Sequence, residues 1–280
     1  MDNINKRILI AFPCRDRAWV LPHFLKHLVN INYDKKLIDI YCIINNSSDS
    51  SHEIMKEFKD KYNNDYNSIQ IEVQNNSQYS IKDTRRTDVR DKIYNWLADL
   101  RNMIVKRCVK LDCDYLFSVD TDILVSSDIL ERLIKHDKDY IASLIYNGYL
   151  YTPRSADEGY DSILNAYKYP NILKQNINGG YDHIVNYRVK NPNLCDKGYL
   201  IEVDFTGAVF LVSKDVCKVA RFGWDKQGED EMFCRSAREN GFKLYCDLSL
   251  YSQHMMSEDI LKMYLNNELK YNNGDAIKIG

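Results

Sequence analysis

The sequence lacks a long apolar run: no stretch approaches the roughly 20 consecutive apolar residues that cross a bilayer. The chain begins Met1-Asp2-Asn3-Ile4-Asn5-Lys6-Arg7 and then has only a short apolar run before Pro13. A secretory signal requires a longer apolar segment than this. We therefore expect no integral membrane segment and a cytoplasmic location.

An excess of positive charge is also missing. The chain has 38 Lys and Arg against 40 Asp and Glu, a net charge of -2, which argues against a nucleic-acid partner. Cys-x-x-Cys pairs are absent as well. The eight cysteines occur singly, at positions 14, 42, 108, 113, 195, 217, 234 and 246. This scatter predicts buried reduced thiols and excludes an obvious zinc site or disulfide framework.

The first third of the chain alternates between strand-like and helix-like segments. Strands are expected at residues 7–12, 38–44 and 69–73, and helices at 21–30 and 50–62. Ser50 and Glu53 have the spacing of a capping box at the start of the second helix. Strands that alternate with helices in this way predict a parallel sheet.

A polar segment at 74–88 reads as a loop and is followed by the strongest helical pattern in the chain. Apolar residues recur at helical spacing from position 91, at Ile93, Trp96, Leu97, Leu100, Ile104 and Cys108. Further strands are expected at 115–119, 140–146, 199–205, 208–212 and 243–246, and helices at 127–136, 229–240 and 257–269. Residues 147–199 are dense in Tyr, Asn, Gly and Pro, which favours an irregular insertion that shapes a pocket wall.

Two carboxylates end the strand at 115–119. Asp120 and Asp122 are one residue apart and follow an apolar run, so they lie at the carboxyl end of a strand, where ligands of open α/β sheets collect. Two such oxygen ligands can hold a divalent cation, which can hold a diphosphate. The alternative is a turn or helix cap, and Ser126-Ser127-Asp128 just beyond does resemble a cap.

Other candidate residues also have two readings. Arg101 flanks the apolar face of its helix, where it can extend to solvent or reach an anion at the sheet edge. Glu229 and Asp230 begin a helix, where acidic residues interact well with the helix dipole whatever their chemistry. Trp224 can stack on a sugar or belong to the core. His254 can be structural or can complete a coordination shell, since imidazole suits Mn²⁺ better than Mg²⁺.

Taken in order, these features resemble the GT-A glycosyltransferases, particularly the bacterial family 2 type. The resemblance runs from about residue 7 to 256. It implies an α/β, GT-A (nucleotide-diphospho-sugar transferase) fold: a mostly parallel central sheet flanked by helices, with an aromatic-rich insertion on the acceptor side. It implies one domain over 1–280, with a nucleotide-binding half at about 1–125, an acceptor and catalytic half at about 126–256, and a C-terminal helix and tail at 257–280.

The resemblance also implies roles for individual residues. Donor contacts fall on Pro13, Arg15, Asn45, Asp49, Arg101, Asp120, Thr121, Gly207 and Trp224. Asp120, Asp122 and His254 are the implied metal ligands, and Asp230, beside Glu229, is the implied catalytic base. The family commonly has an acidic residue where this chain has Asn45. Thr206-Gly207-Ala208 resembles the turn that lets donor and acceptor approach the backbone, although glycine there is equally expected in a tight β connection.

The implied reaction transfers a hexose or N-acetylhexosamine from a UDP-sugar, with Mn²⁺ or Mg²⁺ and inversion, to a glycan or protein hydroxyl such as Ser or Thr of flagellin. A retaining GT-A enzyme is the first alternative, and it would not need a base at Asp230. A non-catalytic sugar-binding protein on the same fold is the second. A sugar nucleotidyltransferase would require a glycine-rich phosphate loop near the N-terminus, and residues 12–17 contain no glycine.

Overall fold

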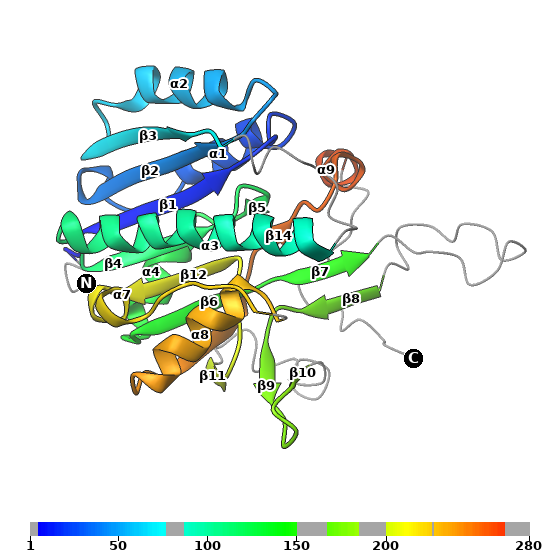
Figure 1. Ribbon diagram of the computed structural model, residues 1–280. Coiled ribbons are helices and arrows are strands. Elements are labelled where there is room, and N and C mark those ends of the chain that lie inside the picture. The colour runs from blue at the N-terminus through cyan, green and yellow to red at the C-terminus, as the bar shows by residue number, and fades with distance from the viewer. Residues whose placement is uncertain (1–4, 77–86, 150–166, 185–199, 226, 267–280) are drawn as a thin grey trace, which may run out of the picture.

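The structure is a computed structural model that describes residues 5–76, 87–149, 167–184, 200–225 and 227–266. At its centre is an eight-stranded sheet with the order β11-β13-β6-β12-β4-β1-β2-β3 (Figure 1). Neighbours are parallel except that β12 runs antiparallel to β4 and β6, and β11 antiparallel to β13. Six of the eight strands therefore point the same way, as the mostly parallel prediction requires.

The first half of the chain builds one side of this sheet. Its elements are β1 (Ile8–Cys14), α1 (Leu21–Val29), a 3₁₀ turn (Lys35–Leu37), β2 (Ile38–Asn45), α2 (Ser51–Tyr62), β3 (Ser68–Gln74), α3 (Thr87–Lys110) and β4 (Tyr115–Val119). All five strands and helices predicted up to residue 73 are present. The long helix begins at Thr87 and not at 91, so the last part of the predicted loop is helical.

The second half adds the remaining strands of the large sheet and three small two-stranded sheets. Its elements are β5 (Ile123–Leu124), α4 (Ile129–Lys135), β6 (Tyr140–Leu144), β7 (Tyr146–Tyr149), β8 (Tyr167–Pro170), β9 (Leu173–Gln175), β10 (Tyr181–His183), β11 (Leu200–Val203), β12 (Val209–Ser213), α7 (Lys214–Val219), α8 (Glu229–Glu239), β13 (Leu244–Tyr251), β14 (Gln253–His254) and α9 (Glu258–Leu265). The described parts of the predicted insertion contain β7 paired with β8 and β9 paired with β10.

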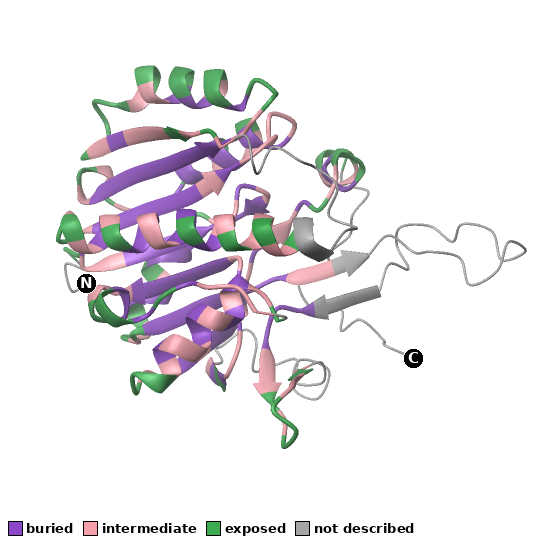
Figure 2. Ribbon diagram, viewed as in Figure 1, coloured by how far each residue is buried: buried purple, intermediate pink, exposed green. Residues whose placement is uncertain are grey.

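Helices cover both faces of the sheet, so the strands are buried on both faces. Along β1, Ile8, Ile10 and Phe12 pack into one core, and Leu9 and Ala11 pack into the other. The first core is closed by α1, α2, α4 and α9, and the second by α3, α7 and α8. Figure 2 shows the result as buried strands between helices whose outer faces are exposed.

Several local predictions are wrong. The Ser50 side chain makes no capping hydrogen bond; Asp49 instead accepts from the Ser51 N–H and hydroxyl, at 3.0 and 2.6 Å. The strand predicted at 243–246 continues to Tyr251, and helix α7 was not predicted at all.

Gly241 does follow the α8 helix with a φ of +87°, as expected of a glycine that ends a helix. The cysteines of the described residues are buried and unpaired.

Candidate active site

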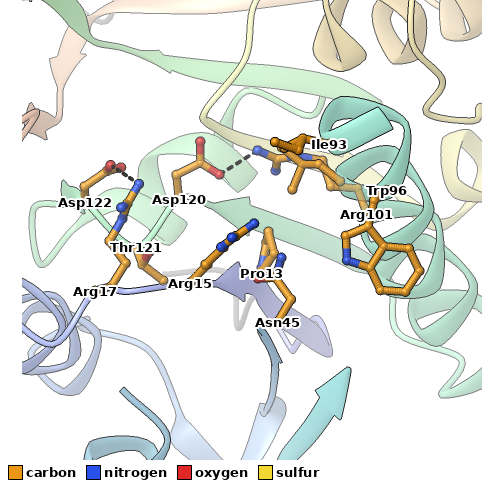
Figure 3. Close-up of a pocket in the computed structure, with 11 residues that line it drawn as sticks. Pro13, Arg15, Arg17, Asn45, Ile93, Trp96, Arg101, Asp120, Thr121 and Asp122 are labelled. Atoms are coloured by element: carbon orange, nitrogen blue, oxygen red, sulfur yellow. Dashed lines mark hydrogen bonds and ion pairs between the residues drawn. The ribbon is translucent and has the colours of Figure 1, made fainter. Parts of the chain in front are cut away.

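A pocket lies at the carboxyl ends of β1, β2 and β4, against helix α3 (Figure 3). It is lined by Pro13, Arg15 and Arg17 after β1, Asn45 at the end of β2, Ile93, Trp96, Leu97 and Arg101 of α3, and Asp120, Thr121 and Asp122 after β4. The parallel strands bring their polar ends together at this edge, as the sequence predicted. Seven of the predicted site residues line the pocket: Pro13, Arg15, Asn45, Arg101, Asp120, Thr121 and Asp122.

Arg101 is a buried cation at the back of the pocket. Its side chain is only 5% exposed, and its Nη2 lies 2.8 Å from Oδ1 of Asp120 and its Nε 3.6 Å from Oε1 of Glu229. Burial alone would lower the pKa of Arg101, but nearby Asp120 and Asp230 raise it overall. Its Nε and Nη1 have no hydrogen-bond partner among the described residues. A buried guanidinium with unmatched donors is suited to receive an anion.

Asp122 is the more deeply buried carboxylate of the pair. Burial raises its pKa, and His254 and Arg17 act in the opposite direction. Arg17 Nη2 lies 3.2 Å from Oδ2, and His254 Nε2 lies 3.8 Å from Oδ1 (Figure 3 shows the Arg17 contact). The ionised form of Asp122 is therefore favoured by positive charge beside it, which Arg17 supplies here and which a bound metal ion would also supply.

Backbone pairing holds Asp122 and His254 in place. Strand β14 pairs with β5, with His254 opposite Ile123, and the N–H of Met255 donates to the carbonyl of Asp122 at 2.7 Å. The sequence predicted neither of these two-residue strands. They explain how a histidine late in the chain reaches a carboxylate more than 100 positions earlier.

These side chains suit a divalent cation whose ligands come partly from the protein and partly from a nucleotide. The described part of the chain contains no cluster of three or more His, Cys, Asp or Glu side chains suited to a metal. Asp122 and His254 would supply two ligands, while Asp120 is paired with Arg101. Cations that bind nucleotides are commonly held by one or two carboxylates, with phosphate oxygens and water completing the shell.

Asp230 lies beyond the pocket, against the turn that precedes β12. An ideal Cβ placed on Gly207 would lie 2.1 Å from Oδ2 of Asp230, so only glycine fits beside this carboxylate. Burial raises the pKa of Asp230 to about 7; Arg101 and the Ala208 N–H oppose the rise. Ala208 has a φ of +68°, a strained backbone for a residue with a side chain.

Glu229 and Asp230 lie in the first turn of α8, where acidic side chains interact favourably with the helix dipole, as the alternative interpretation expects. The N-cap is Gly228, whose φ is +112° and which has no side chain to cap the helix. Glu229 also faces Arg101, and burial raises its pKa while Arg101 opposes the rise. The two acidic residues thus sit in one charge cluster with Arg101 and Asp120, whatever they add to the helix dipole.

Asp49 and Trp224 are not among the residues that line this pocket, and both contact neighbouring elements instead. Asp49 Oδ2 accepts from the Ala18 N–H at 2.8 Å, so this carboxylate ties the loop after β2 to the loop after β1. Trp224 stacks on Tyr94 with ring centroids 4.3 Å apart and an interplanar angle of 9°, and its Nε1 donates to Asp91 at 3.0 Å. Both residues brace elements around the pocket.

Sequence reasoning did not assign four of the pocket residues to the site: Arg17, Ile93, Trp96 and Leu97. Arg17 belonged to a stretch interpreted only as a polar loop, and its position five residues beyond the strand predicted at 7–12 was the available signal. Trp96 was counted among the apolar face of its helix, yet that face continues past the sheet edge and lines the pocket. Periodicity identifies which residues share a face, and it does not show where the sheet beneath them ends.

Residues 5–185 match the sequence model described as glycosyltransferase family 25, N-terminal domain. The mannan polymerase II complex anp1 subunit of Schizosaccharomyces pombe is 24% identical over 269 residues, covering 86% of this chain and 62% of that protein. Procollagen galactosyltransferase 1 of Danio rerio is 25% identical over 140 residues, covering 50% of this chain and 23% of that protein. The chain therefore spans less than two thirds of either relative.

Solved structures agree on the fold. GalNAc-T7 with UDP, GalNAc and Mn²⁺ has a TM-score of 0.57 at 16% identity, covering 90% of this chain and 44% of that one. The mannosyltransferase PcManGT of Pyrobaculum calidifontis, with GDP-Man and Mn²⁺, has a TM-score of 0.53 at 9% identity, covering 91% and 58%. The predicted GT-A fold is confirmed. The narrower likeness to bacterial family 2 is not: the matching family is numbered 25, and these curated relatives are eukaryotic.

Proposed function

The chain belongs to glycosyltransferase family 25, and from this premise we propose that it transfers a hexose or N-acetylhexosamine from a UDP-sugar to an acceptor hydroxyl. The observation that carries the proposal is the buried guanidinium of Arg101, whose Nε and Nη1 have no hydrogen-bond partner among the described residues and which lines the pocket beside Asp120 and Asp122. An anionic group such as a diphosphate would satisfy these donors. A ligand without an acceptor oxygen would leave them unmatched.

The pocket offers distinct surfaces for the parts of a nucleotide sugar. Ile93, Trp96 and Leu97 form an apolar and aromatic wall suited to a base, and Asn45 can hydrogen-bond to its edge or to the ribose. Arg15 and Arg101 would bind the diphosphate. Asp49 would act on the nucleotide through the loops that it joins.

Asp122 and His254 would hold the divalent cation, Mn²⁺ or Mg²⁺, with Asp120 in its outer shell. When bound, the cation neutralises charge on the leaving diphosphate as a Lewis acid. Arg101, which Asp120 and Glu229 hold in place, would stabilise the same charge. Asp120 therefore contributes mainly by orienting Arg101.

Asp230 would accept the proton of the attacking acceptor hydroxyl, which gives inversion at the anomeric carbon. A pKa of about 7 suits this role, because the carboxylate is then both available and basic near neutral pH. Gly207 leaves room for Asp230 at the turn, and Glu229 lies next to it in the same charge cluster. A retaining reaction in the same pocket would leave Asp230 without a proton to take.

Both a glycan and a protein hydroxyl remain in the proposal as acceptors. One curated relative is named for procollagen, which is a protein, and another for a mannan polymerase complex. Trp224, stacked on Tyr94 near the start of the helix that carries Asp230, would offer an aromatic ring to the transferred sugar. Among the described residues, no helix is long and apolar enough to cross a membrane.

A panel of nucleotide sugars, incubated with the protein and Mn²⁺, Mg²⁺ or a chelator, tests the proposal. We expect one UDP-sugar to be hydrolysed in a cation-dependent manner, and its transfer product to have inverted anomeric configuration by NMR. Retained configuration would replace the inverting mechanism with the retaining one. Tight binding of a glycan without hydrolysis of any donor would favour the non-catalytic sugar-binding alternative.

A further inference from the structure

The imidazole of His254 has a defined partner on the side that faces away from Asp122. His254 Nδ1 lies 2.9 Å from Oδ1 of Asn147. In this orientation of the amide, Oδ1 accepts the hydrogen bond and Nδ1 carries the ring proton. In the neutral ring, Nε2 is then the nitrogen with the lone pair, and this atom faces Asp122 at 3.8 Å. The protonation of the ring is thus arranged for ligation at Nε2.

The spacing of the two ligand atoms is compatible with one shared cation. Two ligands with bonds of about 2.1 Å can lie up to about 4.2 Å apart across an ion. The separation of 3.8 Å between Nε2 of His254 and Oδ1 of Asp122 falls between the ~3.0 Å of adjacent and the ~4.2 Å of opposite octahedral ligands, so a shift of a few tenths of an ångström brings both atoms onto one ion. With side chains only 16% and 13% exposed, neither residue has much freedom to turn away.

Asn147 comes from a different element than either ligand. It lies on β7, whose pairing with β8 places Asn147 opposite Tyr169, whereas His254 and Asp122 are joined through β14 and β5. Figure 1 shows the paired strands β7 and β8 leaving the sheet beside β14. Asn147 is also the first residue of the segment that we assign to the acceptor wall. One hydrogen bond thus connects that segment to the cation site.

We propose that Asn147 is a positioning residue that fixes the tautomer and ring orientation of His254, so that Nε2 and Asp122 together bind a divalent cation. Outer partners of this kind set the basicity and direction of a histidine ligand, and their loss commonly weakens metal binding by roughly 10- to 100-fold. The inference rests on the cation site of the proposed function. It does not depend on the identity of the sugar or on the base.

The direct test uses histidine labelled with ¹⁵N in the metal-free protein. At a pH where the ring is neutral, we expect the His254 signals to report a proton on Nδ1 and none on Nε2. His254→Ala assigns the signal. A proton on Nε2 in the otherwise unchanged protein would overturn the inference without the need for any Asn147 variant.

Cation affinity gives the second readout, with Mn²⁺ binding measured by EPR in the presence of UDP. We expect Asn147→Leu to weaken Mn²⁺ binding at least tenfold, in line with outer-shell losses in other metal sites. Asn147→Asp keeps an accepting oxygen and should bind Mn²⁺ as well as the unchanged protein or better. Asn240→Leu, at the exposed end of α8, is the matched control and should bind normally.

Different results would overturn the role of Asn147 and the cation site itself. Unaltered Mn²⁺ affinity in Asn147→Leu, with normal binding by the unchanged protein, would overturn the role of Asn147 alone. Absence of Mn²⁺ binding in the unchanged protein, with and without UDP, would remove the cation from the proposed function. Equal weakening in Asn147→Leu and Asn147→Asp would show that the effect is not one of hydrogen-bond acceptance, and would also overturn the role.

Discussion

Arg17 and Asp122 form an ion pair at the mouth of the pocket, with Nη2 of the arginine 3.2 Å from Oδ2 of the carboxylate. The Arg17 side chain is 37% exposed, and Asp122 is 13% exposed. A cation of the chain itself therefore occupies one oxygen of the residue that we assign to the metal. Because Arg17 reaches Asp122 from a solvated loop, it can withdraw at small cost when another cation arrives.

Removal of Arg17 should strengthen cation binding in the absence of nucleotide. We expect Arg17→Ala to lower the Kd for Mn²⁺ by about fivefold, corresponding to the ~1 kcal/mol of a partly exposed ion pair. Mn²⁺ EPR measures the change. Arg17→Lys keeps the charge and should stay close to the unchanged protein. Weaker Mn²⁺ binding in Arg17→Ala would mean that the arginine supports the site and does not compete for it.

The indole of Trp96 should contribute to nucleotide binding by stacking. We expect Trp96→Leu to weaken UDP binding roughly tenfold, because base stacking on an aromatic ring contributes about 1–3 kcal/mol. Calorimetric titration with UDP measures the loss. Trp19→Leu changes a partly buried tryptophan packed on the other core and serves as the control. If both variants bind UDP equally well, the base lies elsewhere.

Gly207 should be intolerant of even a methyl group. The Cβ of Gly207→Ala would lie 2.1 Å from Oδ2 of Asp230, so the carboxylate must move. We expect transfer to fall by about 10²-fold or more, as misplacement of a catalytic group commonly causes, while UDP binding is retained. Gly223→Ala is the matched control, since its Cβ would meet only the flexible end of Met232 at 3.1 Å. Equal activity in both variants would contradict the assignment of the turn.

The sequence predicted the strands of the large sheet more completely than the short strand pairing that joins distant segments of the chain. The buried strands β1, β2 and β4 were found because each is a short apolar run with a clear boundary, and boundaries of this kind are local. The β5 and β14 strands are two residues long and exist only because each supplies the other's partner. No pattern within either segment indicates this pairing. Only the family resemblance predicted that His254 and Asp122 belong to one site.

The charge pairing inside the site was equally inaccessible to sequence. Asp120 and Asp122 are the same residue type in the same short segment, yet Asp120 pairs with Arg101 and Asp122 faces Arg17 and His254. The difference arises from the elements that the fold brings to each carboxylate, since helix α3 carries Arg101 and the loop after β1 carries Arg17. Asp49 shows the reverse case: a polar residue after β2 was expected to contact a nucleotide, and its oxygens instead hold the backbone of two loops.

Asp230→Asn should stabilise the fold at neutral and higher pH. The folded-state pKa of Asp230 is raised above its ordinary value to about 7, so folding favours the protonated carboxyl. The stabilising effect of that proton is complete below about pH 4 and is lost as the pH rises to about 7. We therefore expect the gain in Tm of Asp230→Asn over the unchanged protein to be larger at pH 8 than at pH 5. A gain independent of pH would contradict the raised pKa.

The same substitution should abolish most of the transfer activity while leaving the donor bound. We expect Asp230→Asn to lower kcat by roughly 10²- to 10⁴-fold, the usual contribution of a general base, with little change in UDP affinity. In the unchanged protein kcat/KM should rise with pH and level off above about 7, since only the ionised Asp230 can accept the acceptor's proton. The remaining activity of the variant should lack this rise. A variant that transfers sugar at the full rate would instead require a reaction without a base at this position, which the retained configuration of its product would then reveal.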